Sequence, residues 1–498
     1  MDQKKNRHLN SDNLSQISAR LTCPEYDRTK IKTGIVHIGV GGFHRAHQAY
    51  YIHQLLERGE AEDWGICGIG LREEDRRMYE ILTRQDCLYT LLIQHPDGTI
   101  NAEVIGSIKE MILAVESPQL AIDKMANPTT KIVSLTITEG GYNFNPATME
   151  FNFNHPNVQH ELNNPEQPKT VFGYLTAALR KRRENNLPAF SIMSCDNIQH
   201  NGDIARQMLL AFAERQDPAL AKWIKTEVSF PNSMVDRITP VTKQEDINYI
   251  ENTFALKDEW PVICEPFIQW VIEDNFTIGR PSLEEVGVQF VADVTPYEKM
   301  KIRLLNAGHS VLGIPGAVHG IDTINACMED SIFSSFMRRF MDVEVTPILD
   351  NVKGIDINQY KDTLEERFSN PNIKDSVSRI CSESSAKLPK FLIPTLEDNL
   401  KSGGSIIYAS FVLACWCFYS DKETNKNGEA IEIIDVRQKD LHTVAAETDH
   451  DRLSFLSLTD LFGELKNDER FVETYSRMID LIYNTDNVKT VMTDMMER

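Results

Sequence analysis

A lysine, an asparagine and a histidine are spaced along one predicted helix in a way that suits proton transfer. At about 100° per residue of an α-helix, the side chains of Lys301, Asn306 and His309 share one arc with those of Ile302 and Leu305. A solvated face would not carry those aliphatics, and a core face would not carry an unpaired ammonium. We therefore expect a partly dry cleft, where desolvation makes the lysine lose its proton easily and act as a general base.

The residues near this lysine in the sequence are compatible with more than one role for the helix. Asn306 and His309 can donate hydrogen bonds to an oxygen that gains negative charge. A simpler alternative is a helix that ends at Gly308 and is capped by the histidine. Tyr297 and Lys301 also have the Tyr-x3-Lys spacing of short-chain dehydrogenases, in which the tyrosine is the acid–base group, but this chain is far longer than members of that family.

Glycines follow an apolar strand near the N-terminus, as they do in dinucleotide-binding turns. In such a turn the first glycine permits the bend, the second lets a pyrophosphate approach the backbone, and the next helix offers free amides. Gly39 and Gly41 fit these roles, although His44 stands where the usual pattern has glycine or alanine. Helical spacing of apolar residues up to Leu56, before Gly59, predicts the helix that the turn requires. The predicted cofactor site includes the adjacent Gly42 and Phe43.

Acidic residues follow a second predicted strand, residues 65–71. The carboxylates of Glu74 and Asp75 could accept hydrogen bonds from the adenosine ribose of NAD, and they would repel the 2′-phosphate of NADP. The flanking residues Arg72, Arg76 and Arg77 weaken that preference, and acidic runs are usually solvated surfaces.

These segments resemble the polyol-specific long-chain dehydrogenases, and the resemblance covers nearly the whole chain. The motifs that carry it are the glycine turn, the lysine helix and residues 136–142, 193–197, 230–240, 264–270 and 367–371.

The resemblance implies a role for each of several residues. Lys301 would be the general base, Asn306 and His309 would polarise the reacting oxygen, and Glu298 would relay protons to the lysine. Glu298 also has a structural explanation, because Thr295-Pro296-Tyr297-Glu298 has the pattern of a capping box. The residues implied to contact the polyol hydroxyls are Asn197, Asp236, Arg379 and Lys387. From the residues alone, Asp236 with Arg237 could be a surface ion pair, and Arg379 and Lys387 ordinary surface cations.

The function implied is zinc-independent oxidation of a secondary alcohol by NAD, such as C2 of D-mannitol to give D-fructose, and the reverse reduction. Two alternatives are open. One is a sugar-acid reductase of the same family, such as a fructuronate reductase, and the other is a non-catalytic protein that binds a dinucleotide to sense redox state. Turnover of a polyol with NAD separates the sensor from the enzymes.

The fold class predicted is α/β, with an N-terminal Rossmann-type dinucleotide-binding domain and a mostly α-helical C-terminal domain. Strand-like runs at 132–137, 190–194 and 228–230 and a helix near 170–183 favour a mostly parallel sheet in the first half. Helical periodicity follows, so we predict domains at 1–292 and 293–498. Residues 151–167, rich in Asn and Pro, are predicted to form a surface loop.

Composition excludes several classes of partner. The chain has 498 residues with 73 acidic and 52 basic side chains, and its net charge of −21 argues against general binding to nucleic acid or anionic membranes. The nine cysteines are scattered, and His44 and His47 lack a third ligand at zinc-like spacing, so no metal is expected. Without a predicted signal or spanning segment, we expect a cytoplasmic enzyme of a small polyol or ketose.

Overall fold

The computed structural model describes residues 7–145, 148–373 and 375–497. The chain divides between Thr295 and Pro296 into two compact units. Unit 1 is the N-terminal part and unit 2 is the C-terminal part. The predicted fold class is confirmed, because unit 1 contains a Rossmann-type parallel sheet and unit 2 is mostly helical.

Unit 1 is built around a five-stranded parallel sheet with the order β6-β3-β2-β7-β8. Its strands are β2 (Thr33–Ile38), β3 (Gly65–Gly70), β6 (Ile108–Leu113), β7 (Ile132–Leu135) and β8 (Ser191–Ser194). The chain runs outward from β2 to β6 and then returns to β7 on the other side of β2. Strands β2 and β7 therefore meet at a topological switch point, and ligands of such sheets bind outside the carboxyl ends of the strands there.

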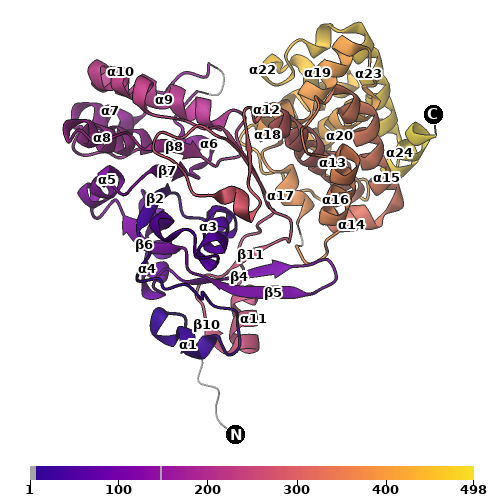
Figure 1. The fold of residues 1–498 in the computed structure, drawn as a ribbon. Helices are drawn as coiled ribbons and strands as arrows, with labels where there is room; N and C mark the ends of the chain where they lie inside the picture. The colour runs from indigo at the N-terminus through magenta and orange to yellow at the C-terminus, as the bar shows by residue number, and fades with distance from the viewer. Residues whose placement is uncertain (1–6, 146–147, 374, 498) are drawn as a thin grey trace. The chain divides into compact units, whose positions relative to one another are not determined.

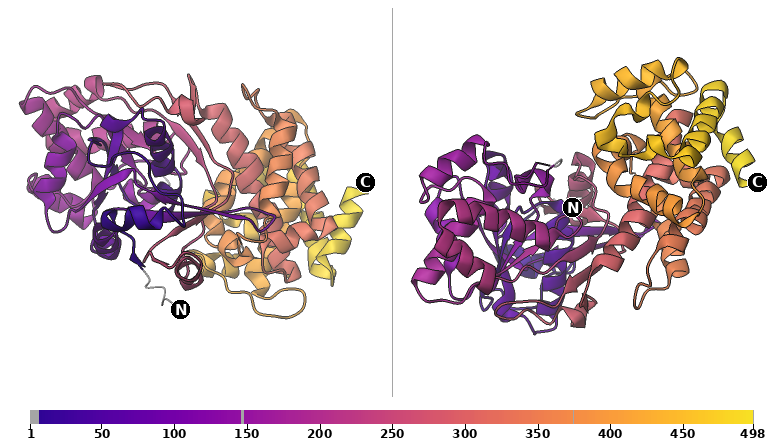
Figure 2. Two further views of the ribbon diagram at one scale, coloured as in Figure 1. Left: turned by 60° about the horizontal axis from the view of Figure 1, so that its bottom comes forward. Right: turned by 90° about the horizontal axis from the view of Figure 1, so that it is seen from above.

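Helices cover both faces of this sheet (Figures 1 and 2). Because successive residues of a strand point to opposite faces, Ile35 packs with helix α3 (Gln48–Glu57), while Val36 packs with α5 (Pro118–Ala126) and α8 (Val171–Glu184) on the other face. Burial on both faces explains the apolar residues Ile35, Val36 and Ile38 of β2, which also contains the buried polar residues Thr33 and His37. The remaining helices of unit 1 are α1 (Leu14–Ile17), α2 (Gly42–Ala46), α4 (Arg76–Arg84), α6 (Thr138–Gly141), α7 (Pro156–Asn163), α9 (Asn201–Gln216), α10 (Pro218–Glu227) and α11 (Gln244–Phe254).

Smaller sheets complete unit 1. One has the order β11-β4-β5, with β4 (Tyr89–Gln94), β5 (Ile100–Ile105) and β11 (Val262–Cys264). Another has the order β13-β12-β9, with β9 (Ser233–Asp236), β12 (Gln269–Glu273) and β13 (Gln289–Val291). A short parallel pair joins β1 (Arg7–His8) to β10 (Leu256–Lys257). The antiparallel pair β9–β12 places Asp236 opposite Gln269.

Two predictions about local structure in unit 1 were wrong. Residues 228–230 are not a strand: the Ser229 carbonyl accepts one hydrogen bond from Ile192 N–H at 2.9 Å, but Pro231 has no N–H to continue a ladder. Residues 151–167 are not only a loop, because they contain helix α7. Its start is explained by Pro156 at the first position and by His155 Nδ1, which accepts from the Asn157 N–H at 3.3 Å.

Unit 2 is an assembly of helices around the buried helices α13 and α20. Its helices are α12 (Thr295–Lys301), which begins at the division between the units, α13 (Ala307–His319), α14 (Ile324–Glu329), α15 (Ser331–Phe340), α16 (Ile357–Phe368), α17 (Val377–Cys381), α18 (Ser384–Phe391), α19 (Ile393–Ser402), α20 (Ile407–Lys422), α21 (Gln438–Ala445), α22 (Thr459–Phe462), α23 (Glu469–Asn484) and α24 (Val488–Met496). Helix α20 packs against α13, α21 and α23. Among the residues that the structure describes, no helix is long and apolar enough to cross a membrane.

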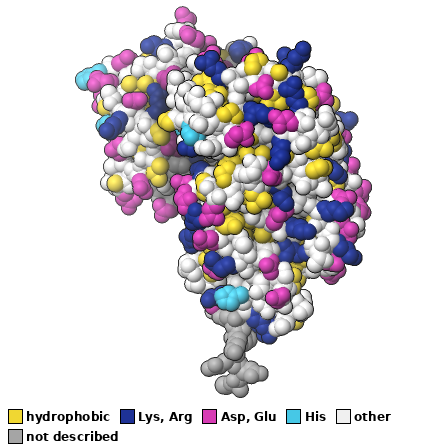
Figure 3. Space-filling model, turned by 90° about the vertical axis from the view of Figure 1, so that its left-hand side faces the viewer, with side chains coloured by type: hydrophobic (Ala, Val, Ile, Leu, Met, Phe, Trp, Pro, Cys, Tyr) yellow, Lys and Arg dark blue, Asp and Glu magenta, His cyan; other side chains and the backbone are white. Residues whose placement is uncertain are grey.

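The surface carries charges of both signs. Figure 3 shows one face, on which Lys and Arg side chains are interspersed with Asp and Glu side chains. This mixture suits a chain of net charge −21 that has 52 basic residues.

A buried carboxylate holds the start of helix α20. Glu344, in the π-helix η6 (Met341–Val345), accepts hydrogen bonds from the N–H groups of Tyr408 and Ala409 at 2.8 and 2.9 Å and from the Ser405 hydroxyl at 3.0 Å. These donors favour the ionised form, but complete burial outweighs them and raises the pKa of Glu344 to about 7. The protonated carboxyl is therefore favoured by folding.

We predict that Glu344 makes the protein less stable as the pH rises. Because its pKa is raised from 4.5 to about 7, its stabilising contribution is complete below pH 4.5 and is lost as the pH rises through 7. Relative to Glu344→Gln, the wild type should lose about 2–3 kcal/mol of unfolding free energy between pH 5 and pH 8. Urea unfolding at both pH values measures this difference. The exposed Glu432→Gln is the control. An unchanged difference between wild type and Glu344→Gln would contradict the assignment.

Candidate functional site

The first glycine of the predicted cofactor turn joins the two strands of the switch point. Gly39 follows β2 with a φ of +94°, in the left-handed region that favours glycine. A Cβ at this position would lie 2.1 Å from the carbonyl oxygen of Thr136, the residue that follows β7. The Thr136 hydroxyl donates a hydrogen bond to the Gly39 carbonyl at 2.7 Å. No other residue fits at position 39 without moving β7.

The other glycines leave space in front of the backbone. Gly41 precedes helix α2, and a Cβ on it would have only the Gly39 carbonyl oxygen near, at 3.9 Å. A Cβ on Gly42 would lie 3.6 Å from Thr239 Cγ2, an ordinary contact. Phe43 is half-buried, and its ring packs on that of His47 with centroids 4.9 Å apart. Packing within the protein does not require glycine at 41, so the open space there suits the close approach of a dinucleotide phosphate.

The helix after the turn is broken, which the sequence did not predict. Instead of one helix up to Gly59, α2 ends at Ala46 and α3 begins at Gln48, with His47 at φ −121° and ψ −85°. The break frees carbonyl groups, and that of Ala46 accepts from Arg237 Nη1 at 2.6 Å. His47 Nε2 bonds to the Gln269 carbonyl at 2.8 Å. Helix spacing in the sequence continues across the break, so only these tertiary contacts reveal it.

Asp236 and Arg237 are buried beside the glycine turn, so the alternative of a surface ion pair is wrong. Asp236 is 4 % exposed at the end of β9. Besides its bond to Ala46, Arg237 donates to the Glu265 carbonyl at 3.1 Å. The same segment continues to Thr239, whose Cγ2 would lie 3.6 Å from a Cβ on Gly42. The structure therefore brings the predicted substrate residue Asp236 and the predicted cofactor turn into one region of unit 1.

Asn197 lies at the carboxyl edge of the same sheet. It is exposed in the turn that follows β8. Its neighbour Asp196 is buried and accepts hydrogen bonds from the N–H groups of Ile137 and Thr138 and from the Tyr142 hydroxyl, at 3.1, 2.8 and 2.7 Å. Burial is the main cause that raises the pKa of Asp196. Asp196 thus ties the loop after β7 to the loop after β8, and Asn197 is the polar residue presented to solvent.

The acidic residues after β3 lie in a short helix, η3 (Glu73–Asp75), that follows the second strand. Glu74 is exposed, whereas Asp75 is half-buried and accepts a hydrogen bond from the Arg72 N–H at 2.9 Å. All three neighbouring arginines have partners. Arg76 pairs with Glu73 and Glu116, and Arg77 lies over the Trp260 ring at 4.9 Å. Arg72 is largely exposed and pairs with Asp75 at 3.6 Å.

The predicted catalytic helix of unit 2 is not a uniform α-helix. Residues Ile302–Asn306 form a π-helix, η5, between α12 and α13, and the Ala307 N–H bonds to the Ile302 carbonyl five residues back. A π-helical turn holds more residues than the ~3.6 of an α-helix, so each residue rotates the helix by less than about 100°. The angle between Lys301 and Asn306, about 140° in a uniform α-helix, is therefore smaller. π-Helical turns are frequent at functional sites.

The surroundings of these residues match a partly dry site. The Lys301 side chain is 6 % exposed, and its neighbours Ile302 and Leu305 are also buried. Asn306 is half-buried, and its amide oxygen is buried without a hydrogen-bond partner among the described residues. An unsatisfied buried polar atom is costly, about 1–3 kcal/mol, and is typical of a group that a ligand satisfies. The structure therefore places a buried lysine and an amide oxygen without a partner close together in the sequence of one helix.

The helix does not end at Gly308, so the alternative of a capping histidine is wrong. Helix α13 continues to His319 and ends at Gly320, which has a φ of +97°. His309 is half-buried, and its ring packs on that of Phe368 with centroids 4.1 Å apart. A Cβ on Gly308 would lie 3.4 Å from the same Phe368 ring, at ordinary contact distance.

Helix α12 begins differently from the predicted capping box. The Thr295 N–H, which a capping box would pair with Glu298, bonds to the Asp293 carboxylate at 2.9 Å. Glu298 is buried one turn before Lys301. The Tyr297 hydroxyl donates to the Lys353 carbonyl at 2.7 Å. This bond gives the tyrosine a structural role, which disfavours it as the acid–base group.

Arg379 and Lys387 lie on neighbouring helices beside the lysine helix. Helices α17 and α18 pack against α13 and η5, and the absence of a side chain at Gly313 admits Ile380 of α17. The Arg379 guanidinium is exposed and paired with Asp375. Lys387 is half-buried rather than an ordinary surface cation, and its Nζ donates to the Ile380 carbonyl at 3.1 Å. Burial and the charge of Arg379 lower the pKa of Lys387.

Residues that could hold a metal are not clustered. Within the described ranges, no group of three or more His, Cys, Asp or Glu side chains has the arrangement of a metal site. All nine cysteines are free and buried. The His44 ring stacks on the His37 ring with centroids 3.4 Å apart.

Comparison with protein families identifies two adjacent domains in the chain. Residues 33–285 match the mannitol dehydrogenase Rossmann domain, and residues 293–483 match the mannitol dehydrogenase C-terminal domain.

Known proteins match over nearly the full length. The mannitol 2-dehydrogenases of Neosartorya fischeri and Aspergillus fumigatus are each 44 % identical over 494 residues, which are 97 % of this chain and 98 % of theirs. The solved structure of Pseudomonas fluorescens mannitol 2-dehydrogenase in a ternary complex with NAD and D-mannitol is 44 % identical, with a TM-score of 0.89 over 99 % of this chain and 100 % of that one. A D-sorbitol dehydrogenase in substrate-free form is 35 % identical, with a TM-score of 0.88 over 98 % of this chain and 100 % of that one.

Proposed function

Because the chain belongs to the mannitol dehydrogenase family, we propose that it is an NAD-dependent polyol dehydrogenase that interconverts D-mannitol and D-fructose. The observation that carries the proposal is the 44 % identity, over nearly the whole of both chains, to a mannitol 2-dehydrogenase whose structure contains NAD and D-mannitol. The glycine turn at the switch point and the buried lysine that precedes a π-helical turn support it.

In the proposed oxidation, Lys301 takes the proton of the reacting hydroxyl as general base. Its burial disfavours the ammonium form and so favours proton acceptance. Asn306 and His309 donate hydrogen bonds to the same oxygen as it gains negative charge. The buried carboxylate of Glu298 passes the proton on from the lysine. NAD, when bound, supplies the acceptor for the hydride from the carbon.

The residues proposed to bind the dinucleotide belong to unit 1, and those proposed to bind the polyol come from both units. The turn formed by Gly39, Gly41, Gly42 and Phe43 binds the dinucleotide phosphates, with open space in front of the backbone at Gly41 and Gly42. Glu74 with Asp75 binds the adenosine ribose. The polyol hydroxyls are bound by Asn197, Asp236, Arg379 and Lys387. The buried carboxylate of Asp236 and the cations of unit 2 suit a ligand that has many hydroxyl groups, because each hydroxyl can donate or accept a hydrogen bond.

The proposal includes a cytoplasmic location and a mechanism without metal. Nine free, buried thiols suit a reducing compartment. The acidic net charge and the mixed surface suit a small neutral substrate rather than a nucleic acid.

We predict that the purified protein oxidises D-mannitol with NAD after prolonged dialysis against a strong chelator. Absorbance of NADH measures the rate, and D-sorbitol, D-arabinitol and, in the reverse direction, D-fructose and fructuronate are compared. D-Mannitol and D-fructose should give the highest kcat/KM. Preference for fructuronate would favour the sugar-acid reductase, and binding of NAD without turnover of any substrate would favour the redox sensor. Activity that chelation abolishes and zinc restores would contradict the lysine mechanism.

Cofactor preference should depend on the acids after β3. Asp75→Asn or Glu74→Lys should increase the kcat/KM with NADP relative to NAD by about fivefold or more, because a charge that repels the 2′-phosphate is removed. The amide oxygen of Asn can still accept the Arg72 N–H, so the turn is kept. Arg72 is then the arginine free to approach the phosphate. Glu80→Gln, on the exposed side of α4, is the control. An unchanged ratio in both variants would remove these residues from the cofactor site.

Lys301→Ala should reduce polyol oxidation by about 10²–10⁴-fold, the usual effect of losing a general base. The wild-type rate should rise with pH through one ionisation, and this variant should lose that dependence while it binds NAD with nearly unchanged affinity. Rates measured from pH 6 to pH 10 give the profile. Tyr297→Phe removes a hydroxyl that the Lys353 carbonyl already binds, so it should keep the profile. Loss of the ionisation in Tyr297→Phe and its retention in Lys301→Ala would reverse the assignment.

A further inference from the structure

A buried histidine lies two residues before the first glycine of the dinucleotide turn. His37 in β2 has no exposed surface, and both of its ring nitrogens are engaged with side chains of β7 and the residue after it. Nδ1 is 2.8 Å from Ser134 Oγ, and Nε2 is 2.8 Å from Thr136 Oγ1. Apolar residues would suffice to pair two buried strands, so this polar arrangement calls for another explanation.

The positions of the protons in this network follow from the hydrogen-bond acceptors. The Gly39 carbonyl can only accept, so the single proton of the Thr136 hydroxyl is donated to it. Thr136 Oγ1 must then accept from His37, whose Nε2 therefore carries the proton. In a neutral imidazole the other nitrogen is an acceptor, so Ser134 donates to Nδ1. Burial lowers the pKa of His37 to about 3, which keeps the ring neutral. The result is a series of hydrogen bonds with one direction of donation: Ser134 donates to His37, His37 to Thr136, and Thr136 to the Gly39 carbonyl.

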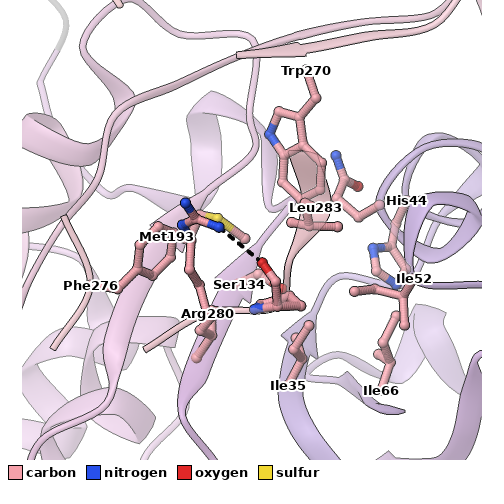
Figure 4. A pocket seen from close by; sticks show the side chains of 13 residues that line it. Ile35, His44, Ile52, Ile66, Ser134, Met193, Trp270, Phe276, Arg280 and Leu283 are labelled. Atoms are coloured by element: carbon pink, nitrogen blue, oxygen red, sulfur yellow. Dashed lines mark hydrogen bonds between the residues drawn. The ribbon is translucent and has the colours of Figure 1, made fainter. Parts of the chain in front are cut away.

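The His37 ring also supports the helix on the other side of the turn. Its face stacks on the His44 ring at 3.4 Å with an angle of 10° between the planes, and His44 lies in α2. His44 and Ser134 line a small cavity whose other walls are largely aliphatic, as Figure 4 shows. One ring therefore contacts the strand before the turn, the helix after it and the neighbouring strand.

We propose that His37 is a positioning residue for dinucleotide binding: through Thr136 it fixes the Gly39 carbonyl, and through His44 it holds α2, so that the backbone at Gly41 keeps the shape that a pyrophosphate requires. The inference rests on the proposed dinucleotide site. It assigns to His37 no contact with the cofactor or the polyol. Loss of the network lets the Gly39 peptide rotate, so affinity for the dinucleotide falls, whereas the chemistry at the polyol is unchanged.

The decisive variants change only the hydroxyl of Thr136. Thr136→Val keeps the shape of the side chain but cannot link His37 to Gly39, and Thr136→Ser keeps the hydroxyl as the matched control. NADH is titrated against the full chain without polyol, and its fluorescence gives Kd. Thr136→Val should raise Kd by about fivefold or more, the effect of one typical hydrogen bond, and Thr136→Ser should stay within about twofold of the wild type. At saturating NAD, kcat and the KM for D-mannitol should change less than about twofold.

A second pair of variants, at position 37, tests the role of the histidine itself. His37→Gln keeps a donor that can reach Thr136, and His37→Leu removes it, so the Kd for NADH should rise more in the second variant. Thermal unfolding without ligand identifies a variant that does not fold, and if His37→Leu fails to fold, the Thr136 pair decides. If Thr136→Val has wild-type affinity for NADH, or if its kcat falls while its Kd is unchanged, the role proposed for His37 is wrong but the proposed function is not. Failure of the wild type to bind any dinucleotide would overturn the proposed function and this inference with it.

Discussion

The carbonyl of Thr136 leaves no room for a side chain at Gly39, and the candidate site of unit 1 depends on that contact. It forces the chain to turn at the end of β2, where the sheet has its switch point. The loops that follow the other strands are then tied to the same edge by buried polar groups. Asp196 binds the loop after β7, and Arg237 binds the end of α2. These contacts hold the predicted ligand-binding residues of separate strands in one region of unit 1.

In unit 2 the corresponding constraint is the π-helical turn before Ala307. An extra residue in one turn brings Asn306 and His309 around the helix toward the side of Lys301. Close packing then completes the surroundings, because the absence of a side chain at Gly313 admits Ile380 of α17, and the Phe368 ring packs on that of His309. The lysine is buried while one amide oxygen of the same helix lacks a partner. Such a combination stabilises the fold less than apolar residues would, which is the expected cost of a reactive site.

The sequence predicted those features that depend on local patterns. The glycine turn, its flanking strands and the helical second half each follow from the spacing of apolar residues and from glycine chemistry. The break at His47, the π-helix and the helix α7 were missed. At the break, the distant residue Arg237 binds a carbonyl that the helix leaves free. Neither the break nor the π-helix leaves a periodic signal in the sequence. The Pro156 start of α7, by contrast, was a signal that the composition of the segment obscured. The network around His37 was also missed, because a histidine in an apolar strand gives no indication of its partners.

A crystal structure of this chain with NAD and D-mannitol would test most directly the claim that Lys301 is the base of a polyol oxidation. We predict that Lys301 Nζ lies within about 2.6–3.2 Å of the C2 hydroxyl oxygen, and that Asn306 and His309 also bind that oxygen. A C2 hydroxyl bound instead by the Tyr297 hydroxyl, or by a metal ion held by the protein, would contradict the account.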